Sequence, residues 1–150
     1  MNHKIRSQAR SAARLAAVQA LYQQHMEKTP LTRLLNEFHQ HRIGQVIEDE
    51  EYADADVDFF DDIVAGVGAR SDEINERIAA RLASGWTLAR LDKTMLQILR
   101  AGTYELIARA DVPKATAISE YVDVAKAFFD DREAKFVNGI LDAVATEAGR

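Results

Sequence analysis

The spacing of apolar residues is the feature that most constrains the fold of this chain. Apolar side chains recur at intervals of three and four residues through most of the 150 residues, and no stretch shows sustained two-residue alternation bounded by turn signals. Only two prolines, Pro30 and Pro113, interrupt the pattern, so long helices are allowed. The sequence therefore predicts an all-α fold of about seven helices and no strand.

The breaks in this pattern give the expected helix boundaries. The seven helices are expected to begin near residues 7, 31, 58, 71, 91, 113 and 130. Ser71 is expected to cap the fourth helix, and Asp130 and Glu133 resemble a capping box for the last one. We expect one domain made of two packed helical subdomains, about 1–70 and about 71–150.

Charge is distributed unevenly along the chain. The protein as a whole is acidic, with 24 Asp plus Glu against 19 Lys plus Arg, yet residues 1–33 hold six bases and one acid. A cationic segment on an acidic protein is typical of a local site for a polyanion.

The basic residues of this segment are spaced for one helix. Arg6, Arg10 and Arg14 lie four residues apart, with Lys4 just before them, and Tyr22 lies two further steps along. Guanidinium groups bind phosphate oxygens bidentately, and a tyrosine can stack on an unpaired base. Cations at a helix N-terminus also oppose the helix dipole, which suggests that a ligand requires them. A solvated helix end and a nucleic-acid contact both remain open.

The segment Lys135-Phe136-Val137-Asn138-Gly139 is the second unusual place. Asn and Gly are poor residues for the middle of a helix, where Gly costs about 1 kcal/mol relative to Ala. One interpretation is close approach of a partner or nucleic acid. The other, which these residues alone favour, is tight helix packing over Gly139 with Phe136 in the core.

Several other patterns give no chemistry. Residues 48–62 contain nine carboxylates and no base, and residues 54–58 resemble the start of a calcium-binding loop. Phe59 and Ala65 stand where such a loop needs Gly and Glu, so this run is interpreted as a solvated linker.

His39 and His41 would face different ways on a helix and make a weak metal pair. Trp86 is interpreted as a packing residue. There is no P-loop, nucleophile elbow or glycine-rich dinucleotide turn, so we expect no catalytic residue, cofactor or metal.

The chain has no cysteine and no apolar run long enough to span a membrane, and both facts limit the cellular compartments that fit it. Disulfides and thiolate chemistry are excluded, which suits a reducing environment, and we expect a cytoplasmic protein without membrane contact. An alternative is that the acid-free N-terminus is a mitochondrial presequence, but its second half carries too many core-type residues.

Three stretches resemble the NusB family of bacterial transcription antitermination factors. They are AAVQALY at residues 16–22, ILRAGTYEL at residues 98–106, and DVPKATAISEYVDVAKAFFDDREAKFVNGILDAVA at residues 111–145. The last stretch is similar to the family's VP, AI-E, AK and KFVNG-LD signature in order and spacing, and the resemblance covers almost the whole chain.

This resemblance implies a non-enzymatic protein built from two small helical bundles. It implies binding of boxA, a short single-stranded RNA signal in nascent ribosomal transcripts, together with NusE, a small-subunit ribosomal protein. It also implies assembly with NusA, NusG and RNA polymerase in a complex that resists termination.

The same resemblance nominates the residues that contact RNA. The family's basic N-terminal element matches Arg10 and Arg14, which Lys4 and Arg6 extend, and its tyrosine near the RNA matches Tyr22. The family's Lys-Phe pair near the RNA matches Lys135 and Phe136. The resemblance thus replaces the core interpretation of Phe136, and the two ends of the chain are expected to meet one RNA.

The chain departs from the family pattern at one turn near the expected RNA path. Phe129 stands where the family often has Gly, and Glu133 stands where it often has Ser, with Arg132 beside it. We expect Glu133 to weaken phosphate contact and Arg132 to restore it.

Two alternatives compete with this function. A related helical domain begins some ribosomal RNA cytosine methyltransferases, but this chain has no cysteine to attack cytosine and no room for a cofactor domain within 150 residues. A homodimer that hides the RNA face is a further alternative that the resemblance leaves open.

Overall fold

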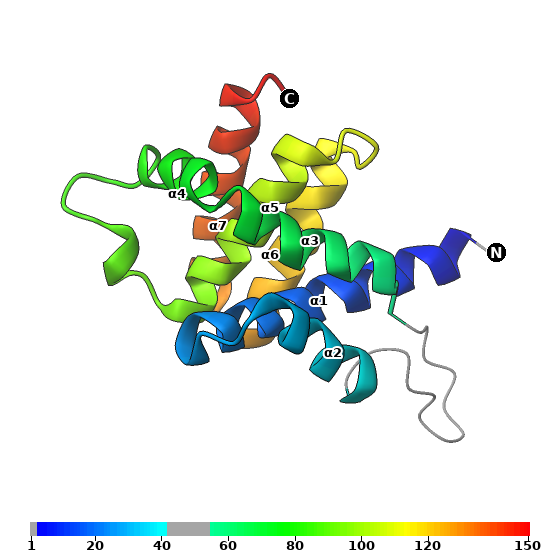
Figure 1. The fold of residues 1–150 in the computed structure, drawn as a ribbon. Helices are drawn as coiled ribbons and strands as arrows, with labels where there is room; N and C mark the ends of the chain where they lie inside the picture. Colours follow the sequence, from blue (N-terminus) through cyan, green and yellow to red (C-terminus); the bar gives the residue numbers. More distant parts are fainter. Residues whose placement is uncertain (1–2, 42–54) are drawn as a thin grey trace. The chain divides into compact units, whose positions relative to one another are not determined.

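A computed structural model describes residues 3–41 and 55–150 of the chain. Over these residues the chain forms seven α-helices and no strand, which confirms the predicted all-α fold (Figure 1). In chain order the elements are α1 (His3–Glu27), α2 (Leu31–His41), α3 (Val57–Ala69), α4 (Ser71–Ala79), the 3-10 turn η1 (Leu88–Arg90), α5 (Lys93–Ala108), α6 (Lys114–Phe128) and α7 (Asp131–Glu147). No helix among the described residues is long and apolar enough to cross a membrane.

The chain divides into two compact units, Met1–Ala65 and Gly66–Arg150. The division falls inside α3, so the first unit holds α1, α2 and the beginning of α3. The second unit holds α4 to α7. Of the acidic run expected to be a solvated linker, residues 48–54 lie outside the described residues. Its last six residues form the start of α3 and bury Phe59 and Phe60, so the linker interpretation is wrong for that part.

The first unit has a core of aromatic and aliphatic side chains. Phe38 of α2 stacks on Phe60 of α3 with ring centroids 5.5 Å apart, and both rings are buried. α1 and α2 are in contact (Figure 1), and α1 buries small residues such as Ala13 and Ala17. The small side chains of α1 allow neighbouring elements to approach closely, because little volume separates the backbones.

The ends of these helices follow from local chemistry. α1 ends where Lys28 takes a left-handed backbone with φ of 56°, and Pro30 then prevents the helix from continuing. α2 begins at the predicted residue. The carboxylate of Asp56 accepts a hydrogen bond from the backbone N–H of Phe59 at 3.0 Å, which is how an N-cap side chain starts a helix such as α3.

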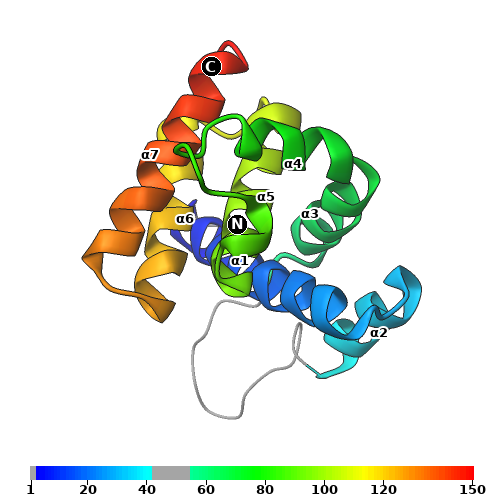
Figure 2. The ribbon, with the colours of Figure 1, turned by 90° about the vertical axis from the view of Figure 1, so that its left-hand side faces the viewer.

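The second unit is organised around α5, which packs against α4, α6 and α7 (Figure 2). Nearly every residue of α5 from Met95 to Leu106 is buried. A Cβ added at Gly102 would lie 2.8 Å from Leu141 Cδ1, so glycine is what permits α5 and α7 to approach this closely.

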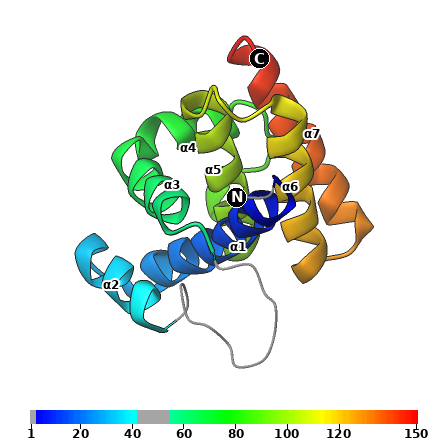
Figure 3. The ribbon, with the colours of Figure 1, turned by 90° about the vertical axis from the view of Figure 1, so that its right-hand side faces the viewer.

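Helices α6 and α7 lie side by side (Figure 3). Helical spacing predicts that Ile118, Val122, Ala125 and Phe129 share the buried face of α6, and this prediction is wrong for Val122 and Phe129. The side chains of α6 that are buried are Ala117, Ile118, Tyr121, Val124 and Ala125, while Val122 is half-buried and Phe129 lies just past the end of the helix.

Two of the predicted caps are also wrong. Ser71 is the first residue of α4 and does not cap it, because its hydroxyl instead accepts a hydrogen bond from Arg100 at 2.9 Å. Asp130 occupies the N-cap position of α7, but its side chain makes no capping hydrogen bond. A cap that the sequence analysis missed is Asp92, whose Oδ1 accepts from the backbone N–H groups of Thr94 and Met95 at 2.8 and 3.1 Å.

Candidate nucleic-acid interface

The basic residues of α1 range from exposed to buried along the helix. Lys4 and Arg6, in the first turns, are exposed. Arg10 is partly exposed, and Arg14 is only 2% exposed. The predicted ladder therefore exists as a helical row, but its four cations do not have equal access to a ligand.

Arg10 is held by the beginning of α3. Its Nε lies 3.8 Å from a carboxylate oxygen of Asp56, and its guanidinium lies 4.5 Å from the centroid of the Phe59 ring. Asp56 thus caps α3 through one oxygen and faces Arg10 with the other. Because Arg10 remains partly exposed, it can still turn a donor toward a phosphate.

Arg14 lies over the same aromatic ring. Its guanidinium is 4.8 Å from the centroid of Phe59, which is itself buried. A desolvated cation over an aromatic ring gains about 2 kcal/mol or more. In this conformation a phosphate can reach Lys4 and Arg6 directly, whereas it reaches Arg14 only if the packing around α1 opens.

Tyr22 lies two helical turns beyond Arg14 and is 40% exposed. Leu15 and Met26 are also exposed and lie seven residues before and four after it, which places the three side chains on one face of α1. A partly exposed phenol on such a face has both an apolar surface for stacking and a hydroxyl for hydrogen bonding.

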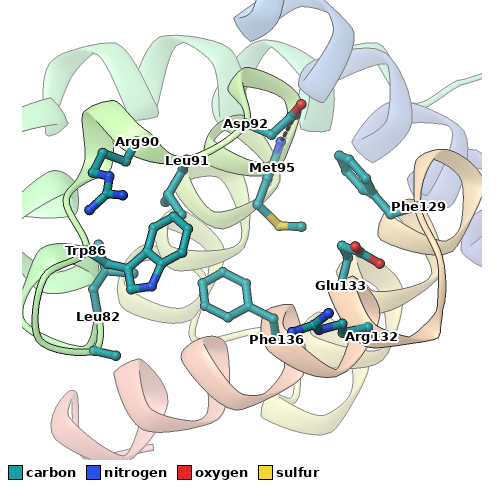
Figure 4. A pocket seen from close by; sticks show the side chains of 11 residues that line it. Leu82, Trp86, Arg90, Leu91, Asp92, Met95, Phe129, Arg132, Glu133 and Phe136 are labelled. Atoms are coloured by element: carbon teal, nitrogen blue, oxygen red, sulfur yellow. Dashed lines mark hydrogen bonds between the residues drawn. The ribbon is translucent and has the colours of Figure 1, made fainter.

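Lys135 and Phe136 lie in the second turn of α7 and are both exposed, Phe136 to 36%. Phe136 stands on the rim of an open groove of about 560 Å³ (Figure 4). The opposite rim comes from residues 82–92, which precede α5, and Met95 of α5 lies between the two rims.

Trp86 is the prominent side chain on that opposite rim. It is 51% exposed, so of the two interpretations, a core or a surface packing residue, the structure agrees with the surface one. The guanidinium carbon of Arg90 lies 5.1 Å from the centroid of the Trp86 ring. The same guanidinium donates a hydrogen bond to the backbone carbonyl of Gly85 at 2.7 Å. Gly85 has a φ of 89°, which turns the chain so that Trp86 follows directly after the bend. The spacing of Trp86 and Arg90, four residues apart, is a sequence signal that could have indicated this side of the groove.

The three residues that depart from the family pattern line the same groove. Phe129, Glu133 and Arg132 lie on the α7 side of the groove, with Glu133 between Phe129 and Arg132 and with Arg132 beside Phe136 in Figure 4. One carboxylate oxygen of Glu133 is buried without a hydrogen-bond partner among the described residues. A buried acceptor of this kind is satisfied when a donor enters the groove.

Asn138 and Gly139 are exposed on α7, and no atom lies within 4 Å of where a Cβ of Gly139 would stand. The interpretation that a helix packs over Gly139 is therefore wrong. Gly102 of α5 is the glycine that serves helix packing in this unit.

The histidine pair and the calcium-like run form no cluster of metal-ligating side chains in the described part of the chain. His39 Nε2 lies 2.6 Å from Asp61 Oδ1, which joins α2 to α3, and the side chain of His41 is outside the described residues. Within 3–41 and 55–150 no three metal-ligating side chains come together.

The geometry defines an all-helical protein with two accessible surfaces suited to an anionic, partly aromatic ligand. One is the exposed beginning of α1, and the other is the turn of α7 that carries Lys135 and Phe136. Cations alongside exposed aromatic rings are typical of proteins that bind single-stranded nucleic acid.

Comparison with known proteins gives the family. Residues 11–146 match the NusB family. The transcription antitermination protein NusB of Sphingopyxis alaskensis is 72% identical over 142 residues, which cover 95% of each chain. The chain belongs to the NusB family of transcription antitermination proteins.

Solved structures agree on the fold. NusB of T. maritima superposes with a TM-score of 0.75 at 30% identity, covering 92% of this chain and 91% of that one. NusB in a crystal structure of the antitermination factors NusB and NusE with double-stranded RNA superposes with a TM-score of 0.73 at 23% identity, covering 97% and 99% of the two chains.

Proposed function

We propose that this chain is a non-enzymatic RNA-binding adaptor that binds single-stranded RNA of the boxA type together with NusE in the cytoplasm. The observation that carries the proposal is that Lys4 and Arg6 project exposed from the first turns of a helix whose middle, residues 13–21, is largely buried. Family membership supports this function, since the curated relatives are named antitermination proteins. A solved relative is described in complex with NusE and RNA.

In this proposal phosphates contact Lys4, Arg6 and Arg10, while unpaired bases stack on Tyr22 and Phe136. Lys135 adds a further phosphate contact on α7. Arg14, which is buried against Phe59, positions α1 and Arg10 in the folded protein. Its direct contact with RNA stays a prediction that requires α1 to repack.

Three or four phosphate contacts on single-stranded RNA predict a modest salt dependence. Each neutralised phosphate contributes about −0.7 to the slope of log K against log salt, so the slope should be about −2 to −3. So few phosphate contacts give only modest RNA affinity, which a protein partner can raise by completing the site.

We place NusE at the groove between residues 82–92 and α7. The groove is mostly apolar, and Trp86 with Arg90 supplies the side-chain types that most often dominate binding at protein interfaces. With NusE bound, the complex would join NusA, NusG and RNA polymerase and resist termination. A homodimer that covers the RNA contacts is the competing assembly, and light scattering at the concentrations used for binding would detect it.

Anisotropy titrations of a labelled boxA-type RNA test these assignments. Lys4→Ala with Arg6→Ala should weaken RNA binding and reduce the salt slope by about 1.4, because two contacts are lost. Trp86→Ala should weaken NusE binding and leave RNA binding by the chain alone unchanged. A Lys4→Ala/Arg6→Ala variant with the affinity and slope of the wild type would exclude the start of α1 as the RNA contact.

A further inference from the structure

Asn138 and Gly139 lie at the centre of α7, where the structure gives them no role in the fold. Both residues are exposed, and a Cβ at Gly139 would meet nothing within 4 Å. Gly139 is also helical, so it needs no left-handed backbone. A glycine in the middle of a helix costs stability, and nothing within the described residues offsets that cost.

The other described glycines each have a local explanation. Gly66 and Gly102 leave room for Tyr104 and Leu141, and Gly85 and Gly149 have positive φ angles. Gly68 resembles Gly139 in having open space, but it is the last residue but one of α3, where the helix loses little by having glycine. Gly139 is thus the described glycine whose cost is highest and whose reason is missing.

The position of Gly139 on α7 connects it to the proposed RNA contacts. It follows Lys135 by four residues and Phe136 by three, and side chains at these intervals are neighbours on a helix surface. The missing side chain therefore leaves bare helix backbone beside both residues. Asn138 follows Lys135 by three residues and stands on the other side of that bare strip.

The charges along this face are mixed, since Asp131, four residues before Lys135, is an exposed carboxylate on the same side of α7. The carboxylate on the next turn, Asp142, lies 3.3 Å from the ammonium group of Lys114, so its charge is already paired. Lys135 stands at the opposite end of the strip and is exposed.

We propose that the strip formed by Lys135, Asn138 and Gly139 binds the nucleotide next to the base that stacks on Phe136. The sugar of that nucleotide rests against the α7 backbone at Gly139, and its phosphate meets Lys135. The Asn138 amide, with two donor hydrogens and one acceptor oxygen, hydrogen-bonds the edge of its base and so contributes to RNA sequence preference. This inference rests on the proposed RNA binding and adds a specificity-determining residue to it.

Gly139→Ala separates this role from any role in folding. Alanine fits the open space and favours helix, so the melting temperature should rise by about 2–4 °C. The added methyl group would meet the nucleotide, and the affinity for labelled single-stranded boxA-type RNA should fall at least about fivefold. Gly68→Ala is the matched control, because its Cβ also meets nothing, and it should leave RNA affinity unchanged.

Asn138→Ala tests the reading of the base edge. It should weaken binding of boxA-type RNA roughly three- to tenfold and affect a base-permuted RNA much less, since one set of hydrogen bonds is lost. Equal loss on both RNAs would show that Asn138 reads no base, and the specificity claim would be wrong.

Phe136→Ala distinguishes failure of this inference from failure of the proposed function. If Phe136→Ala weakens RNA binding while Gly139→Ala matches the wild type, the proposed function stands and the strip is not part of the site. If neither variant affects RNA, the RNA contact on α7 is itself wrong. If Gly139→Ala spares RNA but loses NusE, the strip belongs to the protein partner and the inference is overturned.

Discussion

Replacing Arg14 with alanine should destabilise the protein in the absence of RNA. The guanidinium is 2% exposed and lies 4.8 Å from the centroid of the Phe59 ring. Loss of a desolvated cation–π contact costs about 2 kcal/mol, and loss of two buried methylene groups costs about 0.8 kcal/mol each. Part of this is offset because the charge no longer has to be buried. The free energy of unfolding should therefore fall by roughly 3 kcal/mol.

Thermal unfolding followed by circular dichroism at 222 nm measures this change. For a chain of this size, a loss of 3 kcal/mol lowers the melting temperature by about 6–12 °C. Arg6→Ala is the control on the same helix, and its exposed side chain should leave stability within about 0.5 kcal/mol. An Arg14→Ala protein that melts within a degree of the wild type would refute the structural role of Arg14.

The remaining predictions concern other parts of the fold. Gly66→Ala should lower stability by about 1–3 kcal/mol, because its Cβ would lie 2.2 Å from two ring atoms of Tyr104; unchanged urea unfolding would show that the ring moves freely. Asp92→Ala should cost about 1 kcal/mol through loss of the α5 cap, with Asp92→Asn retaining most of it; equal losses in the two variants would contradict capping. The hydrogen bond from Arg70 lowers the pKa of Glu73 below its ordinary value, so Glu73 stabilises the fold above its unfolded pKa and loses that contribution as pH falls through the folded pKa. Glu73→Gln should consequently be less stable than the wild type at pH 7 and equal to it in acid, and a difference that persists below pH 3 would contradict this origin.

Much of the fold could be predicted from the sequence because helical periodicity is a local signal. The start of α2 at Leu31, directly after Pro30, follows from proline and apolar spacing alone. The caps could not be predicted as safely, because a polar side chain near a helix start has several partners to choose from. Ser71 bonds Arg100, which is 29 residues away in sequence.

The residue types of the candidate site could be predicted from the sequence, but which of its side chains are exposed could not. The four-residue spacing of Arg6, Arg10 and Arg14 indicates one helical row, yet only tertiary packing places Phe59 under two of these cations. The openness around Gly139 likewise depends on where α5 and α6 lie, since α7 makes its close contact with α5 at Gly102 instead. Single-sequence patterns carry neither piece of information.

The measurement that tests the account most directly is a titration of labelled boxA-type RNA with the wild type and with Lys4→Ala/Arg6→Ala, each with and without NusE. NusE should tighten RNA binding by the wild type, and the variant should bind RNA more weakly in both conditions while melting at the same temperature as the wild type. Wild-type affinity in the variant, or no RNA binding by the wild type even with NusE present, would contradict the claim that this chain is an RNA-binding adaptor acting through α1.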